Sequence, residues 1–250
     1  MTTSAAPRPS VVIILAAGEG KRMKSALPKV LHPVAGRSLL GHVLEAAATV
    51  ELAHVVVVVG HGRDQVTEHL SEIAPWALTV VQEEQKGTGH AVRIALSEVR
   101  ARGLEIDDAP VVVLTGDTPL LTGNTLIGLL IEHAQSNAVA TVLTASLTDP
   151  TGYGRVLRGG SGQVTGIVEH KDASVEQLAV TEINSGMYAF SASHLDTALT
   201  RITTNNAQGE EYLTDVLGFL EGDGETISAS MCSDSNEILG VNDRFQLSQA

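Results

Sequence analysis

The sequence predicts an α/β protein built on a Rossmann-like, doubly wound and mostly parallel sheet. Short apolar runs rich in β-branched residues alternate with helix-like stretches through about the first 145 residues. Runs such as Val55–Val59 are apolar at every position, which is typical of strands covered by helices on both faces. A hydrophobic content of 43% provides a sizeable core, and the longest apolar runs are far too short to span a bilayer.

The elements of the first part follow one another in simple alternation. We expect strands at Val11–Leu15, Val55–Val59, Thr79–Val81, Val111–Leu114 and Val139–Ala145. We expect helices at Leu39–Val50, Gln65–Ile73, His90–Arg102 and Thr125–Gln135, with Ser38 as the N-cap of the first. This order predicts parallel strands joined by crossover helices.

After Asp149 the composition and the hydrophobic pattern of the sequence change. Glycines and alternating apolar residues in 149–170 predict a β-hairpin. We further expect a strand at Glu182–Phe190, helices at Leu195–Ile202 and Tyr212–Leu220, and a strand at Thr226–Met231. We therefore expect a single domain over residues 1–250, with a disordered lead-in at 1–10, a nucleotide-type half at about 11–145 and a substrate-type half at about 146–240. Residues 241–250 read as the opening turns of a helix that stops early, which indicates a piece of a longer protein.

Composition excludes several classes of function. The net charge of −13 argues against nucleic acid as a partner, and the aromatic share of 3% argues against base stacking on an aromatic platform. The single cysteine, Cys232, excludes a disulfide framework and fits a cytoplasmic setting. The nine histidines form neither an H-E-x-x-H motif nor a cluster at ligand spacing, so we expect no zinc site. The run after Arg8 imitates a signal peptide, but a basic motif stands where the cleavage site would be.

The stretch LAAGEGKRM, Leu15–Met23, follows the first expected strand. A glycine turn after a strand can bind phosphate through free backbone N–H groups. The stretch fails as a dinucleotide loop because Met23 replaces the third glycine, and as an ATPase loop because Leu15 and Arg22 replace a glycine and a hydroxyl residue. Yet residues 20–44 contain five Lys or Arg and no Asp or Glu. A solvated basic turn is one explanation of this island; its place directly after a strand favours a loop that binds polyphosphate.

LAAGEGKRM followed by LPKVLH resembles the L-x-x-G-x-G-T-R-M-x-x-x-x-P-K signature of sugar-1-phosphate nucleotidylyltransferases. Within that group the sequence is most similar to the uridyltransferase half of the bifunctional N-acetylglucosamine-1-phosphate uridyltransferase/glucosamine-1-phosphate acetyltransferases. Further blocks extend the resemblance, in the family's order, over nearly the whole chain: QEEQKGTGHA, GDTPLL, DPTGYGR, VEHKDA, EINSG, NNAQGEEYLTD and GVNDR. Two positions depart from the pattern, since Lys21 stands where the family usually has Thr and Asp243 where many members have a second Asn.

The resemblance implies a fold, a reaction and a cofactor. The fold is that of nucleotide-diphospho-sugar transferases, similar to GT-A enzymes, with a hairpin-rich, sugar-binding second half. The reaction is uridylyl transfer from UTP to N-acetylglucosamine 1-phosphate with Mg²⁺, giving pyrophosphate and UDP-N-acetylglucosamine, a precursor of peptidoglycan. No hexapeptide repeat of the acetyltransferase β-helix occurs in the sequence, so we expect no acetyl transfer. The oligomeric state stays open, and a monomer is favoured because full-length relatives assemble largely through that β-helix.

The resemblance also assigns residues to roles. Arg22 and Lys29 would be the catalytic cations, and Asp117 and Asn242 the protein ligands of Mg²⁺. The nucleotide would be bound by Leu15, Ala16, Ala17, Gly18, Gln82, Gly87 and Thr88. The sugar would be bound by Gly154, Glu169, Asn184, Tyr212 and Thr214.

These residue types suit those roles. Asp117 follows an expected strand, at the end where ligands of parallel sheets gather, and Mg²⁺ prefers such hard oxygen ligands. A glutamine amide such as that of Gln82 offers both a donor and an acceptor to the imide edge of uracil. Taken singly, most of these residues also have plain structural explanations as turn, cap or surface positions.

Two alternative functions remain at this stage. One is nucleotidyl transfer with another base or another sugar 1-phosphate, which uses the same machinery. The other is a non-catalytic sensor of nucleotide sugars. Arg22, Lys29, Asp117 and Asn242 argue against the sensor, because mere binding requires neither leaving-group cations nor metal ligands.

Overall fold

The computed structural model describes residues 8–51, 54–106 and 109–250. Within them a nine-stranded sheet has the strand order β11-β7-β10-β6-β1-β4-β5, with β8 and β9 attached to β10. The strands are β1 Val11–Ala16, β4 His54–Val59, β5 Leu78–Val81, β6 Val111–Thr115, β7 Ala140–Ser146, β8 Arg155–Arg158, β9 Val164–Val168, β10 Glu182–Phe190 and β11 Ile227–Met231. A separate two-stranded sheet pairs β2 Pro33–Val34 with β3 Arg37–Ser38.

The sheet is mixed, because β10 runs antiparallel to its neighbours and separates two groups of parallel strands. β1 pairs in parallel with both β4 and β6, so that Ile13 lies opposite Val56 on one side and Val113 on the other. β10 runs antiparallel to both β6 and β7, while β11 pairs in parallel with β7. Strands from both expected halves of the chain therefore belong to the same sheet, and the β8–β9 hairpin expected in 149–170 joins it through β10.

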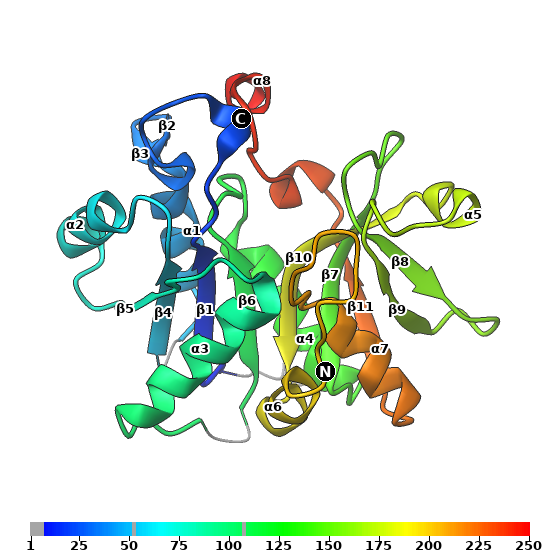
Figure 1. The fold of residues 1–250 in the computed structure, drawn as a ribbon. Coiled ribbons are helices and arrows are strands. Elements are labelled where there is room, and N and C mark those ends of the chain that lie inside the picture. Colours follow the sequence, from blue (N-terminus) through cyan, green and yellow to red (C-terminus); the bar gives the residue numbers. More distant parts are fainter. Residues whose placement is uncertain (1–7, 52–53, 107–108) are drawn as a thin grey trace.

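Helices cover both faces of the sheet, which confirms the doubly wound architecture. The helices are α1 Leu39–Ala48, α2 Arg63–Ile73, α3 Thr88–Ala101, α4 Gly123–Gln135, α5 Val175–Leu178, α6 Ala192–Leu199, α7 Asp215–Gly222 and α8 Arg244–Gln249. In Figure 1, α3, α6 and α7 lie in front of the sheet, and the β8–β9 hairpin stands at the opposite side of the molecule from β4 and β5. Alternate residues of β1 enter two apolar clusters, Ile13 toward α3, α6 and α7, and Ile14 toward α1, α2 and α4.

Burial of apolar side chains on both faces explains why these sequences form strands here. The β1 residues Val11, Ile13 and Ile14 have no exposed surface, and their β-branched side chains are well suited to a pleated, covered surface. Ser38 caps α1, as expected, by accepting a hydrogen bond from Gly41 N at 3.0 Å. Among the described residues, no helix is both long enough and apolar enough to cross a membrane.

Several boundaries differ from the sequence-based expectations. α6 begins three residues earlier than Leu195 and ends at Leu199, and α7 begins at Asp215 rather than Tyr212. The expected lead-in falls mostly outside the described residues. Ser10, its last residue, is buried, and its N–H donates to Pro110 O at 2.9 Å, directly before the start of β6. The single-turn helices Lys21–Met23 and Lys29–Leu31 in the basic segment were not expected, because neither has a hydrophobic period long enough to detect.

Candidate active site

A cleft of about 650 Å³ lies at the carboxyl ends of β1, β5 and β6. Every residue expected to bind nucleotide, to act as a catalytic cation or to hold the metal lines it: Leu15, Ala16, Ala17, Gly18, Arg22, Lys29, Gln82, Gly87, Thr88, Asp117 and Asn242. Ligands of open α/β sheets bind at this end of the strands because the crossover loops leave a crevice there. The position of the cleft therefore follows from the topology.

The main chain of the loop after β1 is held in place by contacts with other parts of the protein. Ala17 O accepts a hydrogen bond from His61 N at 3.1 Å and another from Gln85 Nε2 at 2.9 Å. Gly20 is left-handed, with φ +64°, and a Cβ there would lie 2.7 Å from Lys29 Cβ. Glycine at position 20 thus lets the loop turn and lets Lys29 pass close behind it.

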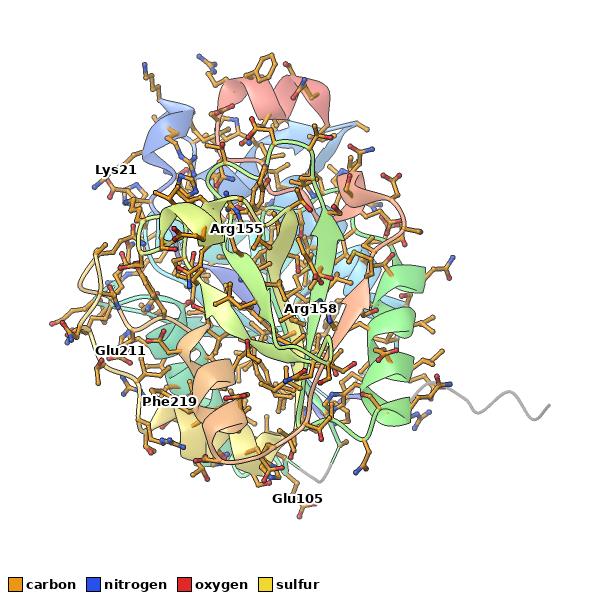
Figure 2. The ribbon with its side chains drawn as sticks, turned by 90° about the vertical axis from the view of Figure 1, so that its right-hand side faces the viewer. Lys21, Glu105, Arg155, Arg158, Glu211 and Phe219 are labelled. Carbon is orange, nitrogen blue, oxygen red and sulfur yellow. The ribbon has the colours of Figure 1, made fainter. Side chains whose placement is uncertain are left out.

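The basic residues of the loop have different surroundings. Arg22 lines the cleft and is exposed, so its guanidinium is available to an anion. Lys21 projects outward from the rim of the molecule, as Figure 2 shows, and pairs with Glu19 at 2.9 Å. That hydrogen bond to Glu19 raises the pKa of the Lys21 ammonium. The departure from Thr at position 21 therefore adds an exposed ion pair, and both of its members also line the cleft.

The Lys29 ammonium contacts two side-chain oxygens that come from distant parts of the chain. It forms an ion pair with Asp117 and donates to Asn242 Oδ1 at 3.2 Å. Asp117 follows β6, and Asn242 precedes α8. Because both oxygens contact one ammonium, they converge on the same small region of the cleft.

Short-range contacts place Asn242 beside Asp117. Val241 N donates to Asp117 O at 2.9 Å, and a Cβ on Gly240 would lie only 3.3 Å from Asp117 Oδ1. Asn242 N donates to Gln246 Oε1 at 2.8 Å, and Gln246 N donates to Asp243 Oδ1 at 2.8 Å. Asp243 therefore caps α8, a position in which Asp and Asn serve equally well, so this departure from the family pattern keeps the local structure.

The donors at this point suit a magnesium ion. Asp117 and Asn242 supply hard oxygen atoms, and Mg²⁺ is commonly held by one or two protein oxygens together with phosphate oxygens and water. Within residues 8–51, 54–106 and 109–250, no group of three His, Cys, Asp or Glu side chains is arranged to hold a metal. A metal at Asp117 and Asn242 would therefore take most of its ligands from substrate phosphates and water.

The opposite wall of the cleft carries Gln82, Gly87 and Thr88. Gly87 has φ +109°, and a Cβ there would lie 2.5 Å from Glu211 O. Thr88 Oγ1 accepts a hydrogen bond from Leu213 N at 3.0 Å, which fastens the start of α3 to the segment before α7. Gln82 is buried directly after β5, and its Nε2 donates to Gly87 O at 3.1 Å. This wall is thus preformed by the protein's own contacts.

The expected sugar-binding residues lie outside the lining of this cleft and form a second cluster. Asn184 N donates to Gly154 O at 3.0 Å, and Thr214 Oγ1 donates to Glu169 Oε1 at 3.2 Å. A Cβ on Gly154 would lie 3.5 Å from both Asn184 Cβ and Glu169 Oε2, so the four residues surround one point. Tyr212 stands at the side of this group, where its hydroxyl accepts from Gln208 Nε2 at 2.9 Å.

Burial determines the electrostatics of the second cluster. It raises the pKa of the Glu169 carboxyl, an effect that the hydrogen bond from Thr214 opposes and that the negative charges of Asp172, Asp215 and Glu210 reinforce. Burial likewise raises the pKa of the Tyr212 hydroxyl. A partly buried carboxylate with a single neutral donor has spare acceptor capacity, which hydroxyl groups of a bound molecule could satisfy.

Two observations connect the cluster to the cleft. Burial raises the pKa of the Tyr153 hydroxyl, and the charges of Asp117 and Arg22 also act on it, so Tyr153, the neighbour of Gly154 in the chain, lies near the cleft. A Cβ on Gly186, in the bulge where the register of β10 against β7 shifts, would lie 3.0 Å from Thr115 Cγ2. The residues expected to bind nucleotide and those expected to bind sugar therefore lie close to each other.

Sequence reasoning did not select several residues that the structure brings to the site. Gln85, Thr115 and Glu210 line the cleft, and Tyr153 lies near Asp117 and Arg22. Gln85, Glu210 and Tyr153 fall inside the quoted blocks QEEQKGTGHA, NNAQGEEYLTD and DPTGYGR, and Thr115 directly precedes GDTPLL. Proximity to those blocks was the available signal.

A glycine loop, cations and hard oxygen donors meeting at the end of a parallel sheet define a nucleotidyltransferase domain. Comparison with known families gives the same class: residues 12–195 match the MobA-like NTP transferase domain, and the chain belongs to that family.

Curated relatives extend the similarity to the whole chain. A bifunctional protein GlmU of Thermobifida fusca is 57% identical over 98% of this chain and 50% of its own length. One from Streptomyces avermitilis is 57% identical over 97% of this chain and 50% of its own, and one from Corynebacterium efficiens is 49% identical over 99% and 51%. The chain thus spans about half the length of the curated relatives that it matches.

Proposed function

We propose that this protein transfers the uridylyl group of UTP to N-acetylglucosamine 1-phosphate. A phosphate oxygen of the sugar phosphate forms a bond to the α-phosphorus, and the bond from that phosphorus to the bridging oxygen breaks, so that pyrophosphate leaves with the electron pair. The observation that carries the proposal is the convergence of Lys29, Asp117 and Asn242 in a cleft whose glycine loop provides backbone N–H groups.

Both reactants are anions, so the protein must first offset their repulsion. Lys29 is mostly buried and contacts Asp117, which fixes its ammonium near the oxygens that would hold the metal. Arg22 is exposed at the rim of the same cleft and can bind the leaving pyrophosphate. Fixed cations of this kind stabilise the charge that develops in the transition state and need no rearrangement during the reaction.

We assign the metal site to Mg²⁺ at Asp117 and Asn242. When bound, the ion supplies Lewis-acid neutralisation of the phosphate oxygens. The chain itself positions the two oxygen donors through Val241, which is hydrogen-bonded to Asp117, and through the α8 cap at Asp243. No protein nucleophile is required, because the sugar phosphate attacks directly.

The base is assigned to the cleft, and the sugar to the neighbouring second cluster. Gln82 and the backbone of Gly87 and Thr88 bind the base, and Leu15, Ala16, Ala17 and Gly18 bind the phosphates and the ribose. Glu169 accepts hydrogen bonds from sugar hydroxyls, and Asn184 both accepts hydrogen bonds from the sugar and its N-acetyl group and donates to them. Gly154, Tyr212 and Thr214 complete this second cluster. The similarity to bifunctional GlmU proteins supports this assignment. We further propose a cytoplasmic setting and a monomeric state for this chain.

The experiment is a coupled assay for pyrophosphate with UTP, N-acetylglucosamine 1-phosphate and Mg²⁺. We expect release that depends on all three, and we expect Asp117→Ala to lose it while remaining folded. Absence of release with a matched active enzyme as the positive control would contradict the proposal. Parallel reactions with CTP, ATP, GTP and dTTP, and with glucose and glucosamine 1-phosphate, decide the base and the sugar. Binding of UDP-N-acetylglucosamine without turnover would instead indicate a sensor.

A further inference from the structure

The amide of Gln82 is oriented by two acceptors of the protein. Its Nε2 lies 3.1 Å from Gly87 O and 3.0 Å from His90 Nδ1. Gly87 O can only accept, so the nitrogen end of the amide must face it. The second hydrogen of the same NH₂ group then points to His90, whose Nδ1 must carry a lone pair and whose ring proton must be on Nε2.

The oxygen end of the amide consequently faces away from Gly87 O and His90 Nδ1. Gln82 is 4% exposed and lines the cleft, and no hydrogen bond to its Oε1 is present within the described part of the chain. Gln82 N donates to Val59 O at 2.8 Å, which fixes the main chain behind the side chain. The wall therefore presents an acceptor at this point rather than an amide of undefined orientation.

An acceptor here distinguishes between the pyrimidines. The N3 position of uracil carries a hydrogen and donates, whereas N3 of cytosine carries a lone pair and accepts. An oxygen opposite N3 attracts the first and repels the second, because two acceptors face each other. Selectivity thus depends on which end of the Gln82 amide faces the base.

We propose that His90 is a positioning residue that holds the acceptor end of Gln82 toward the base and so sets the preference for uracil over cytosine. His90 lies in the first turn of α3, two residues after Thr88, and does not itself line the cleft. Rotating the amide by half a turn would place its oxygen against Gly87 O and would also require the ring proton of His90 to move from Nε2 to Nδ1. Loss of His90 removes the second of these two costs and leaves Gly87 O as the only restraint on the amide among the contacts described.

The inference rests on the proposed function, because it assumes that Gln82 contacts the base. The test measures kcat/KM for UTP and CTP in the wild type, His90→Phe and His90→Asn. Phenylalanine keeps a ring and removes the acceptor, whereas asparagine replaces Nδ1 with an oxygen acceptor at a similar place. We expect the UTP/CTP ratio to fall about tenfold in His90→Phe, through a higher KM for UTP with kcat within about twofold, and to recover in His90→Asn.

A double-mutant cycle with Gln82→Leu shows whether His90 acts through Gln82. We expect His90→Phe to have no further effect on the ratio once Gln82 is leucine. An unchanged ratio in His90→Phe overturns the inference, and so does an equal loss in His90→Asn or full additivity in the cycle. If His90→Phe does not fold, His90→Leu takes its place. A wild type that is inactive with UTP contradicts the proposed function instead, so the two failures are distinguishable.

Discussion

Lys29 and Asp117 form an ion pair inside the cleft, although 88 positions separate them in the sequence. Their side chains are only 14% and 15% exposed. Removing two charges from water costs free energy that their attraction barely offsets, so such a pair contributes little net stability. The pair is better explained by the reaction, which requires a cation and an oxygen donor to stand in place before anionic substrates bind.

Replacing Lys29 should affect both rate and stability. We expect Lys29→Ala to lower kcat by about a hundred- to a thousandfold, because a cation near the transferring phosphate is lost. We also expect the variant to be less stable by about 3–5 kcal/mol in metal-free buffer, because Asp117 is left buried without a partner. Pyrophosphate release and thermal unfolding measure the two effects.

Lys24 provides the matched control for charge. It belongs to the same basic segment but is exposed and does not line the cleft. Lys24→Ala should leave kcat within about twofold of the wild type. Equal losses in the two variants would show that the segment attracts anions only through its net charge. Added Mg²⁺ should raise the melting temperature of Lys29→Ala more than that of the wild type, since the ion can then neutralise Asp117.

The metal assignment predicts a second pair of results. Chelation of divalent ions should abolish turnover, and Mg²⁺ should restore it. Asp117→Asn keeps an oxygen donor and removes the charge, so we expect binding of Mn²⁺, followed by electron paramagnetic resonance, to weaken on the order of tenfold or more. Asp64→Asn, at a fully exposed position on α2, should bind as the wild type does. Wild-type Mn²⁺ affinity in Asp117→Asn would place the metal elsewhere.

The sequence predicted the strands best because their signal is local. A run such as Val55–Val59 is apolar at every position, and the structure buries it on both faces of the sheet. The start of α7 could not be read in the same way. Leu213 N donates to Thr88 Oγ1, so Tyr212–Thr214 serve a contact with α3 instead of continuing the helix. A tertiary contact that limits a helix in this way does not change the spacing of apolar residues, so the sequence pattern does not reveal it.

In the site, too, residues near a recognisable local pattern could be predicted, and residues placed by contacts between distant segments could not. The places of Asp117 and Arg22 could be predicted from nearby residues, because Asp117 follows a recognisable strand and Arg22 follows a glycine turn, whereas their roles came from the family resemblance. The position of Asn242 depends on Val241 bonding to Asp117, and the contact of Thr115 with Gly186 depends on a bulge in β10. Both require the sheet order, which the sequence alone does not specify.

Gly87 should tolerate no side chain. Its φ of +109° disfavours L-residues, and a Cβ would lie 2.5 Å from Glu211 O, a main-chain atom that cannot move independently. We expect Gly87→Ala to lower the free energy of unfolding by about 2–4 kcal/mol and to raise the KM for UTP. Denaturant unfolding and steady-state kinetics provide the measurements.

Gly128 is the control for the Gly87 variant. It lies exposed in α4, and a Cβ there would meet no atom within 4 Å. Gly128→Ala should stabilise the protein by up to about 1 kcal/mol, because alanine has the higher helix propensity. A Gly87→Ala variant as stable as Gly128→Ala would show that the segment before α7 can move away from Gly87.

Glu169 should reduce the stability of the protein at neutral pH. Burial raises the pKa of its carboxyl above the ordinary value of 4.5, so the folded state binds this proton more tightly than the unfolded state does. The contribution of Glu169 to stability is therefore fully present below pH 4.5 and is lost as the pH rises through the raised pKa. Glutamine is neutral at every pH and can still accept the hydrogen bond from Thr214.

Glu169→Gln should accordingly melt at nearly the wild-type temperature at pH 4, and above it at pH 8. A gain of about 1 kcal/mol for removing a partly buried charge corresponds to about 2–4 °C in a protein of this size. Glu176→Gln on α5 is the control, because a hydrogen bond from Ser174 lowers the pKa of that exposed carboxyl and no gain should develop with pH. If Glu169→Gln gains stability equally at both pH values, desolvation of the Glu169 charge is not the cause. The same variant should bind UDP-N-acetylglucosamine more weakly, since glutamine offers the sugar hydroxyls a weaker acceptor than a carboxylate does.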